Sequence, residues 1–430
     1  MNEQILALVM LFGILFLLMA IRVPIAFSLG ISSMITALYL GVNLFAVFQS
    51  LTVSLYNFTF LAIPFFILSA SIMTHGGISD KLMQLSRVIV GKIAGGTAMV
   101  NIVVSMLFGG ISGSSVADVS SIGSMLIPAM VKEGYDADYS VAVTVTSSVQ
   151  GIIIPPSQNM IYYCIAGGGL SISTLFLAGY IPGILLGISL MIPAYCLAKK
   201  RNYPCGYTYT FKEGLRICLD SIIGLMAIVI IIVSVCTGIA SPTESAAIAS
   251  AYGLLVTLFI YRTMNFKKLI QVCLSSLSSL ASIMAVIAMS SMFGYLLSYL
   301  RIPMALANGI ASITTNPVII MVLVNLFLLI CGMFMDMAVL IFMLTPILLP
   351  IVVSAGYDPI HFGIIMILNL GIGLCTPPVG NSLFLGCAIA GIPIEKSVKG
   401  FLPFYASMVI LLIILIAFPQ ISLWLPSLVG

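Results

Sequence analysis

Apolar runs of about 20 residues recur along the chain, and short polar stretches separate them. An α-helix needs about this length to cross a hydrocarbon core of about 30 Å. The pattern therefore predicts a polytopic helical membrane protein. The uninterrupted crossings that we expect are Ile5–Ile21, Pro24–Leu40, Phe58–Thr74, Thr174–Leu197, Leu215–Thr237, Pro242–Ile260, Leu280–Leu300 and Phe401–Leu425.

Shorter stretches mix polar and apolar positions at helical spacing. We expect Asn43–Tyr56, Ser79–Gly91 and Met264–Cys273 to form helices that lie in the membrane interface. The longest polar stretch, Lys199–Glu213, is expected to link the two halves of the chain.

Four further apolar segments are interrupted. Thr97–Val131 contains a Gly/Ser run at 109–115, and Pro317–Ser354 is interrupted at 331–336, so both are expected to form re-entrant hairpins. Val141–Gly169 and Gly363–Gly391 each contain a Pro-Pro pair and are expected to be discontinuous membrane helices. Irregular backbone at membrane depth is tolerated where protein buries it or where it lines a wet cavity. The alternatives are a simple kink at each Pro-Pro pair and a small-residue packing face at Gly109 and Gly113.

The two Pro-Pro segments belong to an internal repeat. A shift of 222 positions places Pro155-Pro156 on Pro377-Pro378 and Asn159 on Asn381. The same shift superposes further pairs: Pro128 on Pro350, Gly134-Tyr135-Asp136 on Gly356-Tyr357-Asp358, and Gly151 on Gly373. Each copy has five crossings and one hairpin. Because five is odd, we expect the two repeats to be inverted relative to each other.

Composition supports a membrane location. Of the 430 residues, 61% are hydrophobic and 7% are charged, whereas soluble domains carry about 25% charged residues. The nine cysteines show no CxxC spacing and are read as small hydrophobes. No basic patch indicates nucleic acid. The N-terminal apolar stretch lacks a basic region and an A-x-A site, so we read it as a retained helix.

The positive charges predict the topology. With Lys199-Lys200-Arg201 in the cytoplasm, the other Lys and Arg residues also become cytoplasmic, except Arg301. Both termini are then periplasmic. The first hairpin enters from the cytoplasm and the second enters from the periplasm.

Helix breaks in inverted repeats form transport sites near the midplane. Free N–H groups at one end of a break favour anions, and free carbonyls at the other favour small cations. Neutral oxygens suit Na⁺ better than a proton relay. The residues expected to bind Na⁺ are Ser112, Gly113, Ser114, Ser115, Pro155, Ser157, Asn159, Gly332, Asp336, Thr376, Pro377 and Asn381. Those expected to bind substrate are Ser115, Gln150, Pro156, Asn159, Pro378 and Asn381.

The ionisable candidates are few. Asp118 and Asp336 lie at or just after the hairpin tips and are either functional or capping carboxylates. His75 and His361 lie at segment ends, where a relay role is not expected. Glu244 is expected to cap a helix. HExxH and GxSxG are absent, which argues against an enzyme, and a channel would need a continuous polar stripe.

The motifs resemble one family over essentially the whole chain. They are Gly113-Ser114-Ser115, Ile127-Pro128, Gly134-Tyr135-Asp136, Ile154-Pro155-Pro156-Ser157, Pro182-Gly183, Pro242-Thr243-Glu244 and Thr376-Pro377-Pro378-Val379-Gly380. These look like the large, DctM-like membrane subunit of tripartite ATP-independent periplasmic (TRAP) transporters. The resemblance implies an inner-membrane secondary transporter that is driven by a Na⁺ gradient. It also implies a periplasmic substrate-binding protein, a separate small membrane subunit and an organic-acid substrate, either a C4-dicarboxylate or sialic acid. The Ser/Asn/Gln-lined breaks favour sialic acid.

The family resembles elevator transporters, in which hairpins and broken helices move as one body against a scaffold. By that analogy the scaffold comprises residues 1–96, 171–316 with the inter-repeat linker, and 393–430. The transport body comprises residues 97–170 and 317–392, each with one hairpin and one broken helix.

Overall fold

The computed structural model describes residues 2–56, 61–206, 209–314 and 316–429. In these ranges the ordered elements are helices, and the one β-type pairing is the isolated bridge between Ala94 and Cys205. The prediction of an all-α fold is therefore confirmed. The first half contains α1 (Asn2–Ala20), α2 (Ile25–Tyr39), α3 (Leu44–Leu55), α4 (Ala62–His75), α5 (Ile78–Val90), α6 (Gly96–Ser112), α7 (Ser115–Asp118), η2 (Val119–Gly123), α8 (Ser124–Lys132), α9 (Ala137–Ser147), α10 (Gln150–Ile153), α11 (Gln158–Ala166) and α12 (Ile172–Lys200).

The second half follows a ten-residue linker, part of which is described. It contains α13 (Phe211–Cys236), α14 (Pro242–Leu255), η3 (Val256–Ile260), α15 (Phe266–Tyr299), α16 (Ile302–Ile313), α17 (Pro317–Gly332), α18 (Met337–Ser354), α19 (Pro359–Leu374), α20 (Asn381–Ala390), α21 (Ile394–Ala417) and α22 (Gln420–Val429). Six of the described helices are long and apolar enough to cross a membrane: α12, α13, α14 with η3, α15, α18 and α21. The bent pair of α4 and α5, which meet at 68°, is a seventh candidate.

The helix boundaries follow the 222-residue offset. Shifted by that amount, the range 115–132 of α7, η2 and α8 becomes 337–354, the range of α18. The range of α6 becomes 318–334, where α17 occupies 317–332. The range of α5 becomes 300–312, where α16 occupies 302–313. The hydrophobic pattern had not marked α16 as an element.

The separate interface helix expected at Met264–Cys273 is wrong, because α15 runs without a break from Phe266 to Tyr299. The stretch at 274–279, between the expected interface helix and the expected crossing at Leu280–Leu300, is rich in serine. Hydroxyls there bond to carbonyls four residues earlier, as Ser276 does to Val272 (2.9 Å) and Ser279 to Ser275 (3.2 Å). A serine hydroxyl bonded in this way leaves the backbone hydrogen bonds of the helix in place at a small cost in stability, and the helix continues.

The bounds of the last crossing also differ from those expected. The last crossing begins at Ile394 and ends at Ala417, and α22 then forms a separate helix. Pro419 lacks the N–H that a continuing helix would need and disfavours helical backbone at the residue before it, so the chain turns there. The crossing expected at Phe58–Thr74 begins within 57–60, which lies outside the described residues, and α4 is described from Ala62.

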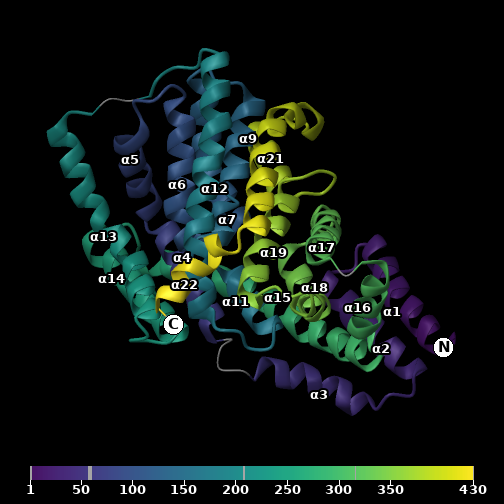
Figure 1. Cartoon of the computed structure of the whole chain (residues 1–430). Coiled ribbons are helices and arrows are strands. Elements are labelled where there is room, and N and C mark those ends of the chain that lie inside the picture. The colour runs from purple at the N-terminus through teal and green to yellow at the C-terminus, as the bar shows by residue number, and fades with distance from the viewer. Residues whose placement is uncertain (1, 57–60, 207–208, 315, 430) are drawn as a thin grey trace.

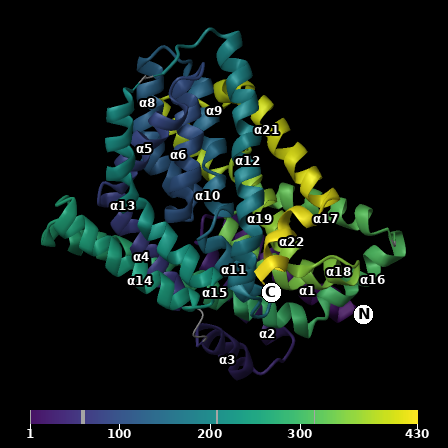
Figure 2. The ribbon, with the colours of Figure 1, turned by 60° about the vertical axis from the view of Figure 1, so that its left-hand side comes forward.

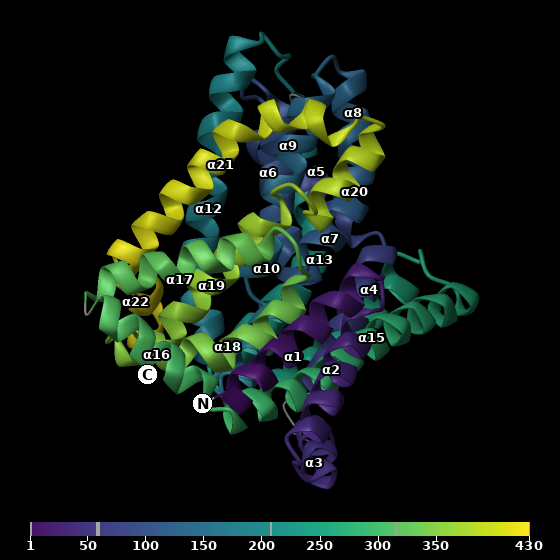
Figure 3. The same cartoon turned by 90° about the vertical axis from the view of Figure 1, so that its right-hand side faces the viewer.

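The linker after α12 lies at one end of the molecule, and both termini lie toward the other end (Figure 1). The turned views in Figures 2 and 3 agree. Helices α1, α2, α4, α14 and α15 pack on one another through the pairs α14–α4, α15–α2, α15–α4 and α1–α2. Helix α12 packs on α6, α9 and α19, and α21 packs on α9, α19 and α12, beside the hairpins and broken helices. The sequence had grouped α12 and α21 with the first set.

Candidate functional site

Each hairpin packs closely on the broken helix of its own half. A Cβ on Gly332 would stand 3.3 Å from the Cα of Gly373, and a Cβ on Gly109 would stand 2.6 Å from the Cα of Gly151. Glycine at these positions brings the two backbones together, so each hairpin tip reaches the level of a Pro-Pro break. The Pro155–Pro156 and Pro377–Pro378 peptide bonds are both cis.

The first tip is the turn between α6 and α7. Gly113 ends α6 with φ +61°, a conformation that glycine adopts without strain. Ser114 caps α7. Asn159, the second residue of α11, donates from Nδ2 to the Gly113 carbonyl at 3.3 Å, and Gln158 donates to the Ser112 carbonyl at 3.5 Å. The amide side chains beyond the break therefore hold the tip of the hairpin.

Asp118 lies beneath this tip, not at its surface. Its side chain is 1% exposed, and Ser112 Oγ donates to one carboxyl oxygen. The other oxygen has no hydrogen-bond partner among the described residues and lies against Gly151. The π-helical turn η2 begins at the next residue.

Ser115 joins three elements. Its hydroxyl lies 2.6 Å from that of Ser148, just after α9, and 2.7 Å from that of Ser382 in α20. All three side chains are buried. The first tip is thus connected to the broken helices of both halves.

The second tip is the turn between α17 and α18. Asp336 caps α18 by accepting from the N–H of Ala338 at 2.9 Å, and its other oxygen accepts from Asn381 Nδ2 at 3.4 Å. The N–H of Val379 donates to the Met333 carbonyl at 3.2 Å. The offset relates Asp336 to Ser114, so the two tip caps are equivalent positions, as are Asn381 and Asn159.

The structure does not bring every candidate to a tip. Gln150 is buried and donates to the carbonyls of Ile102 and Ser147, at 3.3 and 3.1 Å. Ser157 and Thr376 bond to carbonyls of their own segments, Ile152 and Ile372. Among the other predicted residues, Gly332 packs closely against Gly373. The prolines Pro155, Pro156, Pro377 and Pro378 form the two breaks.

Two cavities open beside the tips. One, of about 590 Å³, lies between hairpin 1, the α4–α5 elbow and α15; the other, of about 410 Å³, lies between the start of α18, the start of α2 and α15. Both include Ile283 in their lining. Neither lining includes a Lys or Arg among the described residues. The hydroxyl side chains of the larger cavity are Ser71, Thr74, Ser79, Ser112, Ser114, Ser120, Ser121, Ser124 and Ser279.

Sequence reasoning missed part of this arrangement. Gln158 is inside the Pro-Pro motif and lines the larger cavity, but it was not a candidate. Ser148 and Ser382 carried no signal of their own, because serine is common in these helices. His75 lines the larger cavity at its α4 side. His361 is buried, with Nδ1 2.6 Å from Ser422 Oγ.

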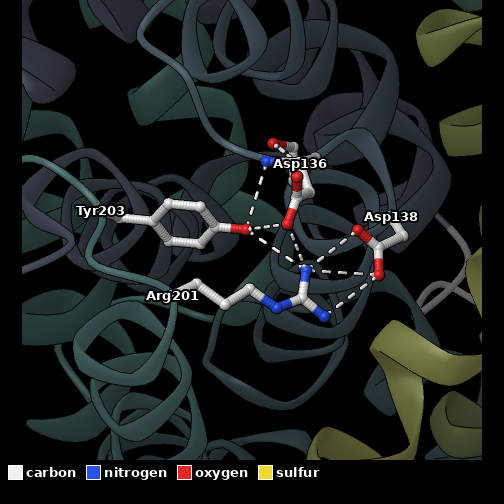
Figure 4. Close-up of polar contacts among 5 residues, drawn as sticks. Asp136, Asp138, Arg201 and Tyr203 are labelled. Carbon is white, nitrogen blue, oxygen red and sulfur yellow. Dashed lines mark hydrogen bonds and ion pairs between the residues drawn. The ribbon is translucent and has the colours of Figure 1, made fainter.

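Glu244 caps α14, as expected: its carboxylate accepts from the N–H of Ser241 at 2.7 Å. A second polar cluster joins the linker after α12 to the start of α9 (Figure 4). Arg201 pairs with Asp136 at 2.7 Å and with Asp138 at 3.2 Å, and the Tyr203 hydroxyl donates to Asp136 at 2.7 Å. The Tyr203 hydrogen bond, and then Arg201, lower the pKa of Asp136.

Known proteins are similar to this chain in sequence or in fold. The chain is 38% identical over 407 residues to the C4-dicarboxylate TRAP transporter large permease protein DctM of Pseudomonas aeruginosa, covering 94% of each chain. It is 34% identical to the sialic acid TRAP transporter large permease protein SiaM of Vibrio cholerae, covering 97% of this chain and 98% of that protein. The fold is similar to the crystal structure of the Alcanivorax borkumensis YdaH transporter, with a TM-score of 0.67 at 12% identity, covering 88% and 89% of the two chains.

The model of the family "Tripartite ATP-independent periplasmic transporter, DctM component" matches residues 12–421, nearly the whole chain. The chain covers 94% and 98% of the two permeases above, and both are named as TRAP transporter large permease proteins. Members of the family are transporter subunits rather than enzymes. The chain therefore belongs to the DctM family, the large permease subunits of TRAP transporters.

Proposed function

We propose that this permease imports an organic acid together with Na⁺ and receives the acid from a periplasmic binding protein. The main support for Na⁺ binding is a pair of equivalent hydrogen bonds. Asn159 and Asn381, which follow the two Pro-Pro breaks, each donate to the tip of the hairpin in their own half, at Gly113 and at Asp336. Each break thus gathers carbonyl, amide and hydroxyl oxygens, the hard ligands that small cations take. A small membrane subunit completes the transporter.

The first Na⁺ site is formed around Ser112, Gly113, Ser114 and Asn159, and the second around Asp336 and Asn381. The carboxylate of Asp336 gives the second site a negative charge, and no Lys or Arg among the described residues lines the adjoining cavity. A bound cation would stabilise this carboxylate, because burying an unpaired charge away from water costs free energy.

The substrate occupies the larger cavity. Its volume of about 590 Å³ and its hydroxyl-rich lining suit a polyhydroxylated acid such as sialic acid. A C4-dicarboxylate is the competing substrate, and the names of the relatives include both classes. The substrate carboxylate is met by hydroxyls, helix N-termini and bound Na⁺.

Transport follows an elevator movement. The hairpins and broken helices form the moving body. Helices α12 and α21 belong to it, because α12 packs on α6, α9 and α19, and α21 packs on α9 and α19. The two repeats are inverted, with the basic linker in the cytoplasm and both termini in the periplasm. The positions of linker and termini at opposite ends of the molecule support this topology (Figures 1 and 3).

The test is uptake into proteoliposomes that contain the complete transporter, with binding protein outside and with or without an inward Na⁺ gradient. Sialic acid and succinate are compared as substrates. We expect uptake of sialic acid that requires Na⁺. Uptake that ignores the Na⁺ gradient would reject the coupling, and uptake of succinate alone would reject the substrate assignment.

Asp336→Asn tests the second ion site, with Asp358→Asn as its matched control. Both residues cap a helix, because Asp358 accepts from the N–H of Ile360 at 2.7 Å, but Asp336 alone also bonds to Asn381. Asp336→Asn should raise the Na⁺ concentration for half-maximal uptake by about tenfold or more, the effect of losing a charged hydrogen-bond partner. Asp358→Asn should lower stability and leave that concentration unchanged. An equal Na⁺ response in both variants would remove Asp336 from the site.

A further inference from the structure

A third cavity lies apart from the hairpin tips, between the end of α5 and the start of α13. It measures about 360 Å³. Polar and apolar side chains both line it: Lys92, Tyr209 and Thr210; Val88, Leu215 and Cys218. The cavity is thus amphipathic, and the transport site described above does not use it.

The seam between α5 and α13 is held at its other end. Lys81 Nζ lies 3.6 Å from a carboxyl oxygen of Asp220, and Ser221 Oγ donates to the Lys81 carbonyl at 3.0 Å. At the cavity end, Gly214 allows Val88 to approach, because a Cβ there would stand 3.3 Å from the valine methyl carbon. The Lys81–Asp220 end of the seam therefore has paired charges, whereas the cavity end has basic side chains.

The basic group at the cavity is Lys92. It is exposed and forms no ion pair within the described part of the chain. Lys212 and Arg216, on the first turns of α13, are exposed beside it. The nearby acid, Glu213, accepts from the N–H of Thr210 at 2.9 Å in a capping box. The protein surface around the cavity therefore carries a net positive charge.

An apolar stripe leads away from the cavity along α13. Its exposed side chains repeat at alternating steps of four and three residues and so lie on one face: Leu215, Leu219, Ile222, Met226, Val229 and Val233. Leu215 belongs to both the stripe and the cavity lining. Because α13 is long and apolar enough to cross a membrane, this face is suited to acyl chains.

We propose that the cavity binds an anionic phospholipid. The headgroup phosphate pairs with Lys92 and accepts a hydrogen bond from the Tyr209 hydroxyl, and an acyl chain follows the stripe from Leu215. A basic pocket between membrane helices is a known arrangement for acidic headgroups. The continuous apolar path from the pocket selects a lipid over a free phosphate ion.

Lipid retention by the complete transporter tests the proposal. The complex is reconstituted in nanodiscs of phosphatidylglycerol and phosphatidylcholine, and the lipids that stay bound after transfer to detergent are measured by native mass spectrometry. The variants are Lys92→Ala and Lys92→Gln, and the control is Lys132→Ala, an exposed lysine at the end of α8. Inorganic phosphate is added as a competitor.

We expect the wild type and Lys132→Ala to retain phosphatidylglycerol in preference to phosphatidylcholine. Both Lys92 variants should weaken retention by about fivefold, the contribution of one basic residue near an acidic lipid surface. Wild-type retention in both Lys92 variants, or equal retention of the two lipids, would overturn the proposal. Displacement of the lipid by millimolar phosphate would overturn it in favour of a free-anion site.

Discussion

The hydroxyl oxygens of Ser115 and Ser382 lie 2.7 Å apart, although the two residues are separated by 267 positions in the sequence. Ser115 begins α7 at the first hairpin tip, and Ser382 lies in the first turn of α20 beyond the second Pro-Pro break. A change at one tip therefore has a direct path to the other half. This contact gives a structural basis for coupling between the two proposed ion sites.

Ser382→Ala should weaken the coupling between the two proposed ion sites. It removes the contact with Ser115 and leaves that between Ser115 and Ser148 intact. A neutral hydrogen bond of this kind contributes about 0.5–1.5 kcal/mol, so the Na⁺ concentration for half-maximal uptake should rise about two- to tenfold. The measurement is initial uptake against Na⁺ concentration. Ser407→Ala is the control, because it breaks a comparable bond to the Ser189 carbonyl (2.6 Å) away from both tips.

Asn159→Ala and Asn381→Ala should each weaken Na⁺ dependence, because each removes the side chain that holds a hairpin tip. Asn369→Ala is the matched control: it breaks a buried bond to Asn325 Oδ1 at 2.8 Å. The control should lose about 1–3 kcal/mol of stability and keep the wild-type Na⁺ titration. Thermal unfolding and uptake on the same preparations separate the two effects. A wild-type Na⁺ titration in both tip variants would contradict the site.

Gly373→Ala should push the second hairpin away from its broken helix. The added Cβ would stand 2.6 Å from the carbonyl carbon of Gly332, closer than packed atoms tolerate. We expect a loss of about 1–3 kcal/mol of stability, typical of overpacking, together with lower uptake. Gly13→Ala meets no atom within 4 Å and should be neutral or slightly stabilising. Equal melting temperatures for the two variants would show that the contact is not tight.

Acid should weaken the cluster at the linker. The folded pKa of Asp136 lies below its ordinary value, so its contribution to stability is present above about pH 4 and is lost as pH falls through the folded pKa. Its side chain is 58% exposed, and solvent screening keeps this contribution below about 1 kcal/mol. Asp136→Asn should therefore melt slightly lower than wild type at neutral pH and equally in strong acid. A difference that grows in acid would contradict this assignment.

The sequence predicted much of the architecture because helix formation is governed by local features. Run length marked the crossings, Pro155-Pro156 and Pro377-Pro378 marked the breaks, and Gly/Ser composition marked the first tip. It misjudged α15, where serines that could end a helix instead bond within it. It did not mark α16, which the structure shows at Ile302–Ile313, the position that the 222-residue offset relates to α5.

The sequence by itself determined the membrane class, the hairpins, the broken helices and the residues at their tips. Only the tertiary structure decided which polar atoms meet: Asn381 with Asp336, Ser115 with Ser382, and Gln150 with α6 instead of a tip. The physical reason is that these contacts join helices far apart in the chain. Hydrophobic periodicity and proline positions determine each helix, whereas close glycine contacts such as Gly332 with Gly373 determine how the helices pack and which side chains come within bonding distance.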